Sequence, residues 1–285
     1  MIIEKEGKER KNTIIKKLLI HTIFSLIFTT IILFTSCDMI EYHPYDCDVS
    51  GETNLTVKNI EKIESLQQSD TLRFAVISDT QRWYDDTYDA VKALNRRNDI
   101  SFVVHCGDIS DFGATKEFMW QRDILQKLRY PYICVIGNHD FLGTGEYVYK
   151  RIFGALNFAF TISGTRFICL NTNALEAEEM DNTPDLEFLD KELSNIGEDI
   201  SQTIIVIHAQ PFSEQFNNAV ADKFNDKIKE FPNLLCVLSG HGHSYSDREL
   251  FSDGTHYIMC PCIHERTYMV FTVTKGNYSY EIHKY

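Results

Sequence analysis

Short apolar runs separated by longer polar segments recur along the chain from residue 72 onward. Their length and their content of valine, isoleucine and phenylalanine predict strands that are buried on both faces of a sheet. These runs cover residues 72–78, 101–106, 132–136, 166–170, 203–207 and 234–238. Helical segments are expected between several of them, at residues 86–96, 115–128 and 184–195. The alternation predicts an α/β fold whose first half contains a largely parallel sheet.

The two ends of this region follow other patterns. A short helix is expected before the first strand, because apolar residues recur at helical spacing at Val57, Ile60, Ile63 and Leu66. A meander of strands is expected at the C-terminal end, from apolar runs at residues 256–259, 267–273 and 278–283. No internal repeat and no linker rich in proline or glycine follows residue 70. We therefore predict one domain over residues 71–285, preceded by a tether and the short helix over residues 37–70.

The first 36 residues have the layout of a signal peptide. A basic segment ending in Lys16 and Lys17 precedes an almost unbroken apolar stretch from Leu18 to Phe34. The ending Phe-Thr-Ser-Cys resembles the lipobox of bacterial lipoproteins, which implies that Cys37 is lipidated. We expect the chain to be held at a membrane of the cell envelope by this lipid, outside the cytoplasm. An uncleaved helical anchor of about 17 to 20 residues is the main alternative, and a buried helix is a third.

The net charge limits the classes of partner. The formal net charge of the whole chain is −13. Residues 1–36 contain six basic and three acidic residues, so their removal lowers the net charge to −16. Such an acidic surface repels polyanions, and no basic cluster is visible in the sequence, which argues against DNA or RNA as a substrate. Nothing in the sequence indicates an oligomeric state.

The cysteines are expected to pack rather than to form a disulfide framework. Four of the eight lie inside apolar runs, where a cysteine behaves as a small hydrophobic residue; these are Cys106, Cys134, Cys169 and Cys236. Cys260 and Cys262 are separated by a single proline and have no second pair of matching spacing. Packing is therefore favoured over metal or redox chemistry for this pair as well.

Ionisable and amide residues follow five of the expected strands at their C-terminal ends. Open α/β sheets bind ligands at this edge. A single aspartate or histidine there is more often an ordinary loop residue, whereas the same feature on five strands indicates one site. The residues are Asp79 and Gln81, then Asp108 and Asp111, then Asn138, His139 and Asp140, then His208, and finally His241 and His243.

In this order the motifs resemble those of the calcineurin-like metallophosphoesterase superfamily. The matching motifs are Asp79-x-Gln81, Gly107-Asp108-x-x-Asp111, Gly137-Asn138-His139-Asp140, His208 and Gly240-His241-x-His243. Similarity to the purple-acid-phosphatase-like branch extends over Phe153-Gly154, residues 157–160 and residues 167–171. The resemblance implies a four-layer αββα sandwich, in which two mixed β-sheets pack together and helices flank them.

The resemblance also implies a reaction and its ligands. A phosphate ester repels nucleophiles through its own negative charge, and two adjacent divalent cations neutralise that charge and generate hydroxide from water near neutral pH. Asp108 is implied to bridge the two cations. Site one is completed by Asp79, Gln81 and His243, and site two by Asn138, His208 and His241. Carboxylate, amide and imidazole ligands suit Mn, Fe, Zn or Mg and exclude a purely thiolate site.

His139 resembles the catalytic histidine of the family, which donates a proton to the leaving group or stabilises the transition state. Asp111 is implied to orient its imidazole, and a role as a helix N-cap is the alternative for this aspartate. His105 is expected in the core, and His256 and His264 are expected to have structural or surface roles. Arg82, Trp83 and Tyr84 follow the first motif directly. Either they line the substrate pocket, with Arg82 meeting a phosphate oxygen, or Trp83 caps the core.

Gln81 is the departure from the family pattern, because most members have a histidine there. A glutamine carbonyl coordinates more weakly, so a non-catalytic binding lipoprotein with a retained phosphoesterase fold is the alternative to an enzyme. The sequence leaves open whether the substrate is a monoester or a diester. Small phosphomonoesters, sugar or nucleotide phosphates and phospholipid headgroups all remain candidates.

Overall fold

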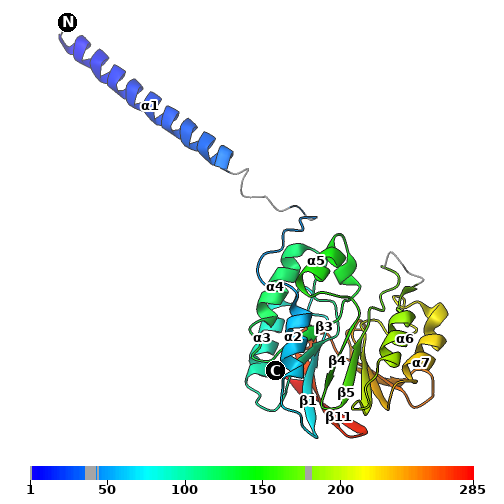
Figure 1. The fold of residues 1–285 in the computed structure, drawn as a ribbon. Helices are drawn as coiled ribbons and strands as arrows, with labels where there is room; N and C mark the ends of the chain where they lie inside the picture. Colours follow the sequence, from blue (N-terminus) through cyan, green and yellow to red (C-terminus); the bar gives the residue numbers. More distant parts are fainter. Residues whose placement is uncertain (1, 36–42, 44, 177–181) are drawn as a thin grey trace. The chain divides into compact units, whose positions relative to one another are not determined.

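The structure is a computed structural model that describes residues 2–35, 43, 45–176 and 182–285. The chain divides into two compact units, Met1–His43 and Pro44–Tyr285 (Figure 1). The first contains helix α1 (Ile2–Thr35), whose segment Thr13–Ile31 has a mean hydropathy of 1.7 and is long and apolar enough to cross a membrane. A signal sequence shares these properties. The expected lipidation site, Cys37, lies outside the described residues.

Sheet A is one of two mixed sheets in the second unit, and its strand order is β11-β10-β1-β2-β3. The first three strands in the chain, β1 to β3, run parallel, whereas β10 pairs antiparallel with β1 and β11 pairs antiparallel with β10. The strands are β1 (Leu72–Ile77), β2 (Val103–His105), β3 (Tyr132–Cys134), β10 (Thr267–Thr274) and β11 (Asn277–Lys284).

Sheet B has the strand order β4-β5-β6-β7-β9-β8. Its four central strands are parallel, and the two edge strands, β4 and β8, pair antiparallel with their neighbours. The strands are β4 (Phe158–Ile162), β5 (Thr165–Cys169), β6 (Gln202–Val206), β7 (Leu234–Ser239), β8 (Ser246–Glu249) and β9 (His256–Met259).

Alternation along each strand produces three apolar layers. Phe74 and Val76 of β1 face the space between the sheets, whereas Ala75 and Ile77 face the helices on the other side. Successive residues of a strand point to opposite faces, so a strand that is apolar at every position is buried on both. In the central layer the ring of Phe74 stacks between neighbours at centroid distances of 5.1 and 5.4 Å. The continuous apolar runs in the sequence have this physical cause.

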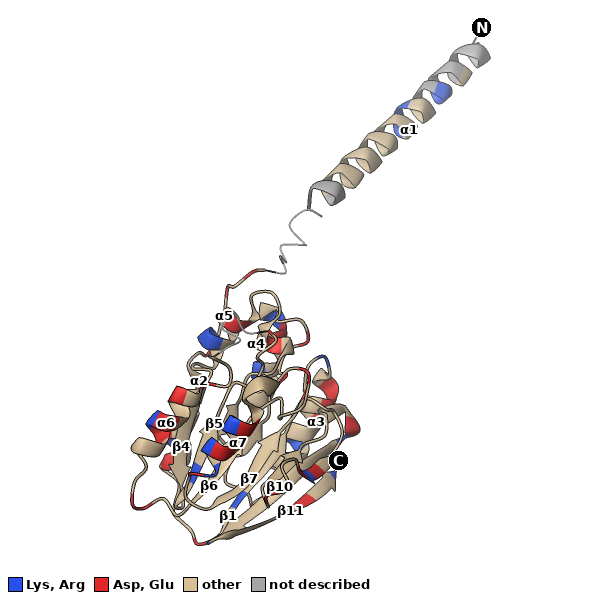
Figure 2. Ribbon diagram, turned by 90° about the vertical axis from the view of Figure 1, so that its right-hand side faces the viewer, with Lys and Arg blue, Asp and Glu red and all other residues tan. Residues whose placement is uncertain are grey.

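Helices cover the outer face of each sheet. α3 (Tyr84–Asn95), α4 (Thr115–Leu125) and α5 (Gly145–Ile152) pack on sheet A. α6 (Leu186–Ser194) and α7 (Ala221–Ile228) pack on sheet B. Figure 2 shows that these outer helices carry many of the acidic and basic residues of the unit. The arrangement confirms the expected four-layer αββα sandwich of two mixed sheets.

Helix α2 (Leu55–Glu64) closes one side of the sandwich. It lies against β3 and β4, the edge strands of the two sheets. Its buried apolar side chains are Leu55 and Ile63, whereas Val57 is 57% exposed. The expected helix is present, but its buried face begins two residues earlier than the spacing from Val57 indicated. Within the second unit, the segment before α2 is also held in place, since Thr115 Oγ1 donates a hydrogen bond to the carbonyl of Asp46 on the expected tether.

Two features of the topology differ from expectation. The C-terminal runs do not form one meander, because β9 belongs to sheet B whereas β10 and β11 belong to sheet A. β4, β8, α5 and α7 were not anticipated as elements. β8 has the sequence Ser-Asp-Arg-Glu and only two half-buried residues, so no apolar run marks it. β4 has the apolar sequence Phe-Ala-Phe-Thr-Ile, and the prediction did not recognise it as a strand.

Candidate metal centre

The predicted ligands converge from both sheets. In sheet A, Asp79 and Gln81 follow β1, Asp108 follows β2 and Asn138 follows β3. In sheet B, His208 follows β6, and His241 and His243 follow β7. β1, β2 and β3 are parallel to one another, and β6 is parallel to β7. The carboxyl ends of these strands therefore meet at one edge of the sandwich.

Backbone hydrogen bonds join the ligand loops to one another. The N–H groups of Asp79 and Gln81 donate to the carbonyls of Gly107 and Asp108, at 3.0 and 3.1 Å. The two sheets are linked directly, because the N–H of His241 donates to both carboxylate oxygens of Asp79 at 3.2 Å. The loops are therefore held by main-chain contacts as well as by any ion between them.

The residues predicted for site two are spaced as the ligands of one ion. Asn138 Oδ1 lies 3.0 Å from His208 Nε2 and 3.0 Å from His241 Nδ1. Donor atoms bound to one cation at about 2.1 Å lie about 3 Å apart when their bonds are at right angles. The distances from the amide oxygen to the two imidazole nitrogens therefore suit ligands of one divalent cation.

The residues predicted for site one lie beside this group. Donor atoms of Asp79, Asp108 and His243 all lie within 4.8 Å of one another, and His243 Nε2 is 3.5 Å from Asp79 Oδ1. Asp108 stands between the groups, since its Oδ1 is 3.4 Å from His208 Nε2. This is the position that a bridging carboxylate requires.

The amide of Gln81 has an orientation that the sequence did not indicate. Its Nε2 donates to Asp108 Oδ2 at 2.9 Å, so the nitrogen faces the centre. Coordination needs the oxygen in that place, which a half-turn of the amide about its last side-chain bond supplies. The backbone of this residue is held separately, because Gln121 Nε2 donates to the Gln81 carbonyl at 2.8 Å. The side chain can therefore turn without loss of the loop.

The centre buries negative charge that needs compensation. Asp79 and Asp108 are 0% and 1% exposed, and the ion pairs that the described part of the chain offers them come from histidines. Burial raises the pKa of Asp79 above its usual range. Burial acts in the same direction on Asp108, but the charges of His208 and His139 outweigh it and lower the pKa of Asp108. Buried carboxylates of this kind are paired or bind metals, so the donor set fits a cation centre.

His208 shows the same electrostatic balance from the other side. Burial lowers its pKa, but the carboxylates of Asp108 and Asp79 outweigh burial and raise it to about 9. The protonated imidazole thus supplies the positive charge that a bound metal ion would otherwise supply. Its Nδ1 is 2.7 Å from the Cys106 carbonyl, which leaves Nε2 directed at the centre.

Backbone strain is concentrated in the ligand loops. Five of the seven predicted ligands have a positive φ, a conformation that costs a non-glycine residue about 1–3 kcal/mol. They are Asp79 (52°), Gln81 (34°), Asp108 (59°), His241 (74°) and His243 (60°). Such conformations persist where the surrounding structure over-determines them, and they cluster at functional sites.

Two glycines allow the ligand loops to approach one another. A Cβ on Gly137 would lie 2.1 Å from Asp108 Oδ1, and a Cβ on Gly240 would lie 2.1 Å from Ser78 Oγ and 2.9 Å from Asp79 Oδ2. Any side chain at either position would displace a carboxylate of the centre. The close approach of the loops therefore requires glycine.

His139 is oriented differently from the expectation. Its Nδ1 is 2.7 Å from the backbone carbonyl of Asp111, whereas the Asp111 carboxylate is 4.0 Å away. The carboxylate instead accepts a hydrogen bond from Arg82 Nη2 at 2.6 Å. Asp111 therefore positions the histidine through its main chain. The alternative N-cap role does not apply to the following helix, whose N-cap is Ala114.

Asp140 is a supporting residue to which the sequence assigned no role. Its buried carboxylate accepts hydrogen bonds from the N–H groups of Ile109, Ser110 and Gly137, at 3.1, 2.7 and 2.9 Å. It ties the loop that carries Asp108 to the loop that follows β3. The sequence pattern could not reveal this role, because only the folded loops bring these N–H donors together.

Glu214 is a second residue that sequence reasoning missed. Its Oε1 lies 2.9 Å from His241 Nε2, on the side of the ring opposite the Asn138 oxygen. A carboxylate accepts hydrogen bonds, so it places the proton on Nε2 and leaves the Nδ1 lone pair available to a cation. Glu214 precedes the strand of His241 by twenty residues and lies in an irregular segment, so no spacing rule identifies it.

The remaining histidines and cysteines lie where structural roles were expected. His105 is the last residue of β2 and is buried, and burial lowers its pKa to about 3. The ring of His264 stacks on Trp83 at 3.7 Å, and His256 pairs with Asp247 at 2.6 Å. The seven cysteines from position 47 to position 262 are free, and six of them are buried.

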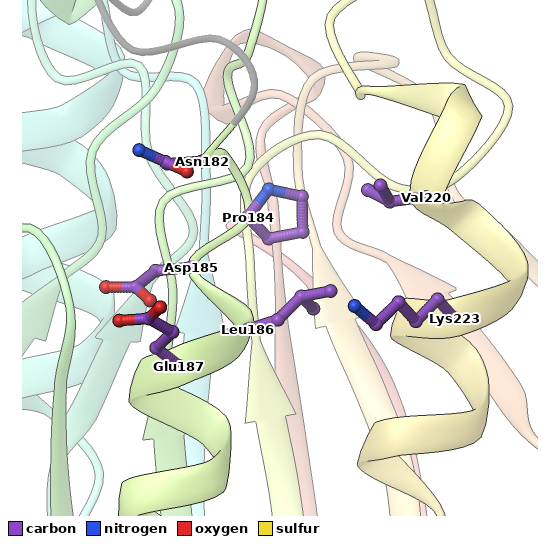
Figure 3. Close-up of a pocket in the computed structure, with 7 residues that line it drawn as sticks. All are labelled: Asn182, Pro184, Asp185, Leu186, Glu187, Val220 and Lys223. Carbon is purple, nitrogen blue, oxygen red and sulfur yellow. The ribbon is translucent and has the colours of Figure 1, made fainter.

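The structure also contains a pocket that is separate from the candidate metal centre. This cavity of about 410 Å³ lies between the start of α6 and the start of α7 (Figure 3). None of the predicted ligands lines it, and one of its acidic residues, Asp185, is occupied as the N-cap of α6 through a 2.9 Å hydrogen bond from the Phe188 N–H.

The comparisons with known proteins agree with this geometry. The family model of the calcineurin-like phosphoesterases matches residues 72–245, which cover more than half of the chain. The chain belongs to this family. It is thereby a metallophosphoesterase by fold and by motif, and the family is one of hydrolases.

Two curated relatives and one solved structure illustrate the similarity. The chain is 25% identical over 174 residues to a probable cyclic nucleotide phosphodiesterase of Synechococcus, covering 54% of this chain and 62% of that protein. It is 27% identical over 180 residues to the glycerophosphodiester phosphodiesterase GpdQ of Enterobacter lignolyticus, covering 56% and 61%. The chain thus matches about three fifths of each relative's length. A purple acid phosphatase from yellow lupin has the same fold, with a TM-score of 0.60, 14% identity and coverage of 76% and 52%.

Removal of the Glu214 carboxylate should weaken site two alone. We expect Glu214→Ala to lower the affinity of one of two metal ions by about tenfold or more, because partners of a ligating histidine typically contribute that much. Glu214→Gln retains an acceptor oxygen and should recover part of the affinity. The measurement is metal content during graded chelation, with the exposed Glu198→Ala as the charge-matched control. Equal retention of both ions by Glu214→Ala and the control would show that His241 needs no such partner.

Proposed function

We propose that the chain hydrolyses phosphate esters at a dinuclear metal centre, and that it does so in the cell envelope. The observation that carries the proposal is the spacing of the donor atoms, which forms two adjacent groups with one carboxylate between them. A structural site would need only one such group. The proposal assigns Asp79, Gln81 and His243 to site one, Asn138, His208 and His241 to site two, and Asp108 to both.

The residues have distinct roles in this account. Two divalent cations, when bound, neutralise the charge of the phosphate and lower the pKa of water. Asp108 holds the two groups of donors at a fixed separation. The N–H of His139 donates to Asp108 Oδ1 at 3.0 Å, which places the histidine at the edge of the centre rather than within either donor group.

His139 is the proposed proton donor to the leaving group. Its side chain is 34% exposed, so one face is open to a substrate while Nδ1 is held by the Asp111 carbonyl. An acceptor at Nδ1 fixes the proton on that atom, and the opposite nitrogen is then the one that exchanges a proton with an oxygen of the substrate.

A phosphodiester is the proposed substrate class. Both curated relatives are named as phosphodiesterases, one for cyclic nucleotides and one for glycerophosphodiesters. Most of the exposed centre is formed by His139 and His243, whose side chains are 34% and 52% exposed, so the donors are reachable from solvent. A panel of soluble diesters and monoesters, tested with Mn, Mg, Zn and Fe, examines this assignment.

Two substitutions separate ligand from acid. Asp108→Asn should abolish turnover and lower the metal content, because it removes a charge shared by both groups of donors. His139→Ala should lower turnover by about 10²–10⁴-fold while two metal ions remain bound, which is the contribution of a positioned acid. Metal analysis and turnover of a diester are measured together, with the surface residue change His256→Ala as the control. Loss of a metal ion in His139→Ala, or wild-type turnover, would contradict the assigned role.

The glutamine at position 81 makes a prediction about metal preference. A neutral amide oxygen is a weaker donor than an imidazole, so site one should hold its ion loosely and accept Mn or Mg. Gln81→His should tighten site one and favour Zn or Fe. The two proteins are compared by metal content and turnover after graded chelation. If the wild type keeps two Zn or Fe ions as tightly as Gln81→His, the glutamine is not a weakening substitution.

The envelope location has its own test at Cys37. Cys37→Ser should abolish acyl labelling and leave an uncleaved precursor, because the thiol is the proposed point of lipid attachment. Total membranes are analysed for label and for the size of the chain, with Cys47→Ser as the matched cysteine control. Continued labelling of Cys37→Ser would refute lipidation there, and an unlabelled wild type that remains in membranes would favour the uncleaved helix.

A further inference from the structure

Arg82 is a positively charged side chain beside the centre, and the proposed reaction gives it no role. It follows Gln81 directly, and its side chain is 56% exposed although its Nη2 is bound to the buried Asp111 carboxylate at 2.6 Å. A guanidinium has five N–H donors in a planar fork, so one hydrogen bond to a carboxylate leaves donors for a second anion. Its exposed edge is therefore positioned by the protein and available to a ligand.

Asp111 places this arginine on the same side of the centre as His139. The carboxylate oxygen that binds Arg82 at 2.6 Å is 4.0 Å from His139 Nδ1, and the carbonyl of the same residue holds that nitrogen at 2.7 Å. In the proposed reaction His139 protonates the leaving group. Arg82 therefore lies near the Nδ1 edge of the His139 ring, and the opposite nitrogen faces the substrate, so a leaving group that reaches Arg82 must extend past the imidazole.

Phe112 gives this side an apolar surface. Phe112 is 62% exposed, and Arg82 Cζ lies 5.8 Å from the centroid of its ring. The loop that carries the ring is held, because the N–H of Phe112 donates to Glu117 Oε2 at 2.8 Å. An exposed aromatic ring next to a fixed guanidinium suits an organic group that carries negative charge.

We propose that Arg82 selects phosphodiesters whose leaving group carries its own anionic group, a carboxylate or a second phosphate, with the organic part of the leaving group against Phe112. The inference rests on the proposed function, since it uses His139 to define the leaving-group side. Arg82 acts by binding and takes no part in proton transfer. With a net charge of −13 on the chain, it provides local attraction where the rest of the surface repels anions.

The test compares two diesters that differ by one carboxylate on the leaving group, phenyl 4-nitrophenyl phosphate and phenyl 3-carboxy-4-nitrophenyl phosphate. The wild type should have the higher kcat/KM for the carboxylate-bearing diester. Arg82→Gln should lower kcat/KM for that diester by about tenfold or more, mainly through KM, and change the neutral diester by less than about threefold. Arg82→Lys should recover part of the preference, because it restores the charge without the fork.

Arg129→Gln is the matched control, because Arg129 is an exposed arginine that lies 5.0 Å from the ring of Tyr130. It should leave both diesters unchanged. An equal loss of kcat on both diesters in Arg82→Gln would show that the arginine only neutralises Asp111 and supports His139, and would overturn the inference. Absence of a charge preference in the wild type would overturn it as well. Failure of the metal-loaded wild type to cleave either diester would instead contradict the proposed function.

Discussion

Two buried carboxylates with histidines as their only ion-pair partners in the described structure are the constraint on which the centre depends. Asp79 and Asp108 are almost wholly inaccessible to solvent, and such charge is tolerated only where positive charge lies beside it. Histidines from the other sheet meet this need, and they do so with their nitrogens at spacings that suit shared ions. The electrostatic requirement and the metal-binding geometry are therefore the same feature of the molecule.

The fold provides this geometry by bringing two sheets together at one edge. Parallel strands of both sheets end there, and main-chain hydrogen bonds, glycines without room for a side chain and left-handed conformations hold the loops in contact. The free-energy cost of this backbone strain is offset by burial of the apolar layers below, in which Phe74 and its neighbours are fully buried. Supporting groups such as the Asp140 carboxylate then make the loops rigid relative to one another.

The sequence was sufficient for the parts of this account that depend on local pattern. Strands buried on both faces leave continuous apolar runs, and the polar residues just beyond them are the proposed ligands, which the structure brings together. Edge strands such as β8 have few buried positions, and the pairing of β9 and β10 with different sheets depends on distant partners, so neither could be read locally. The same reason explains why Glu214 and the main-chain role of Asp111 were missed, since both depend on loop conformations that residue spacing does not encode.

Anomalous scattering from crystals grown with Mn tests the central claim most directly, because it locates ions without reference to activity. The account predicts two peaks about 3.5–4 Å apart at the carboxyl ends of the two sheets. The Asp108 carboxylate should lie between them, and Asn138, His208 and His241 should surround one of the two. A single peak in this position, or two peaks that do not share Asp108, would contradict a dinuclear centre.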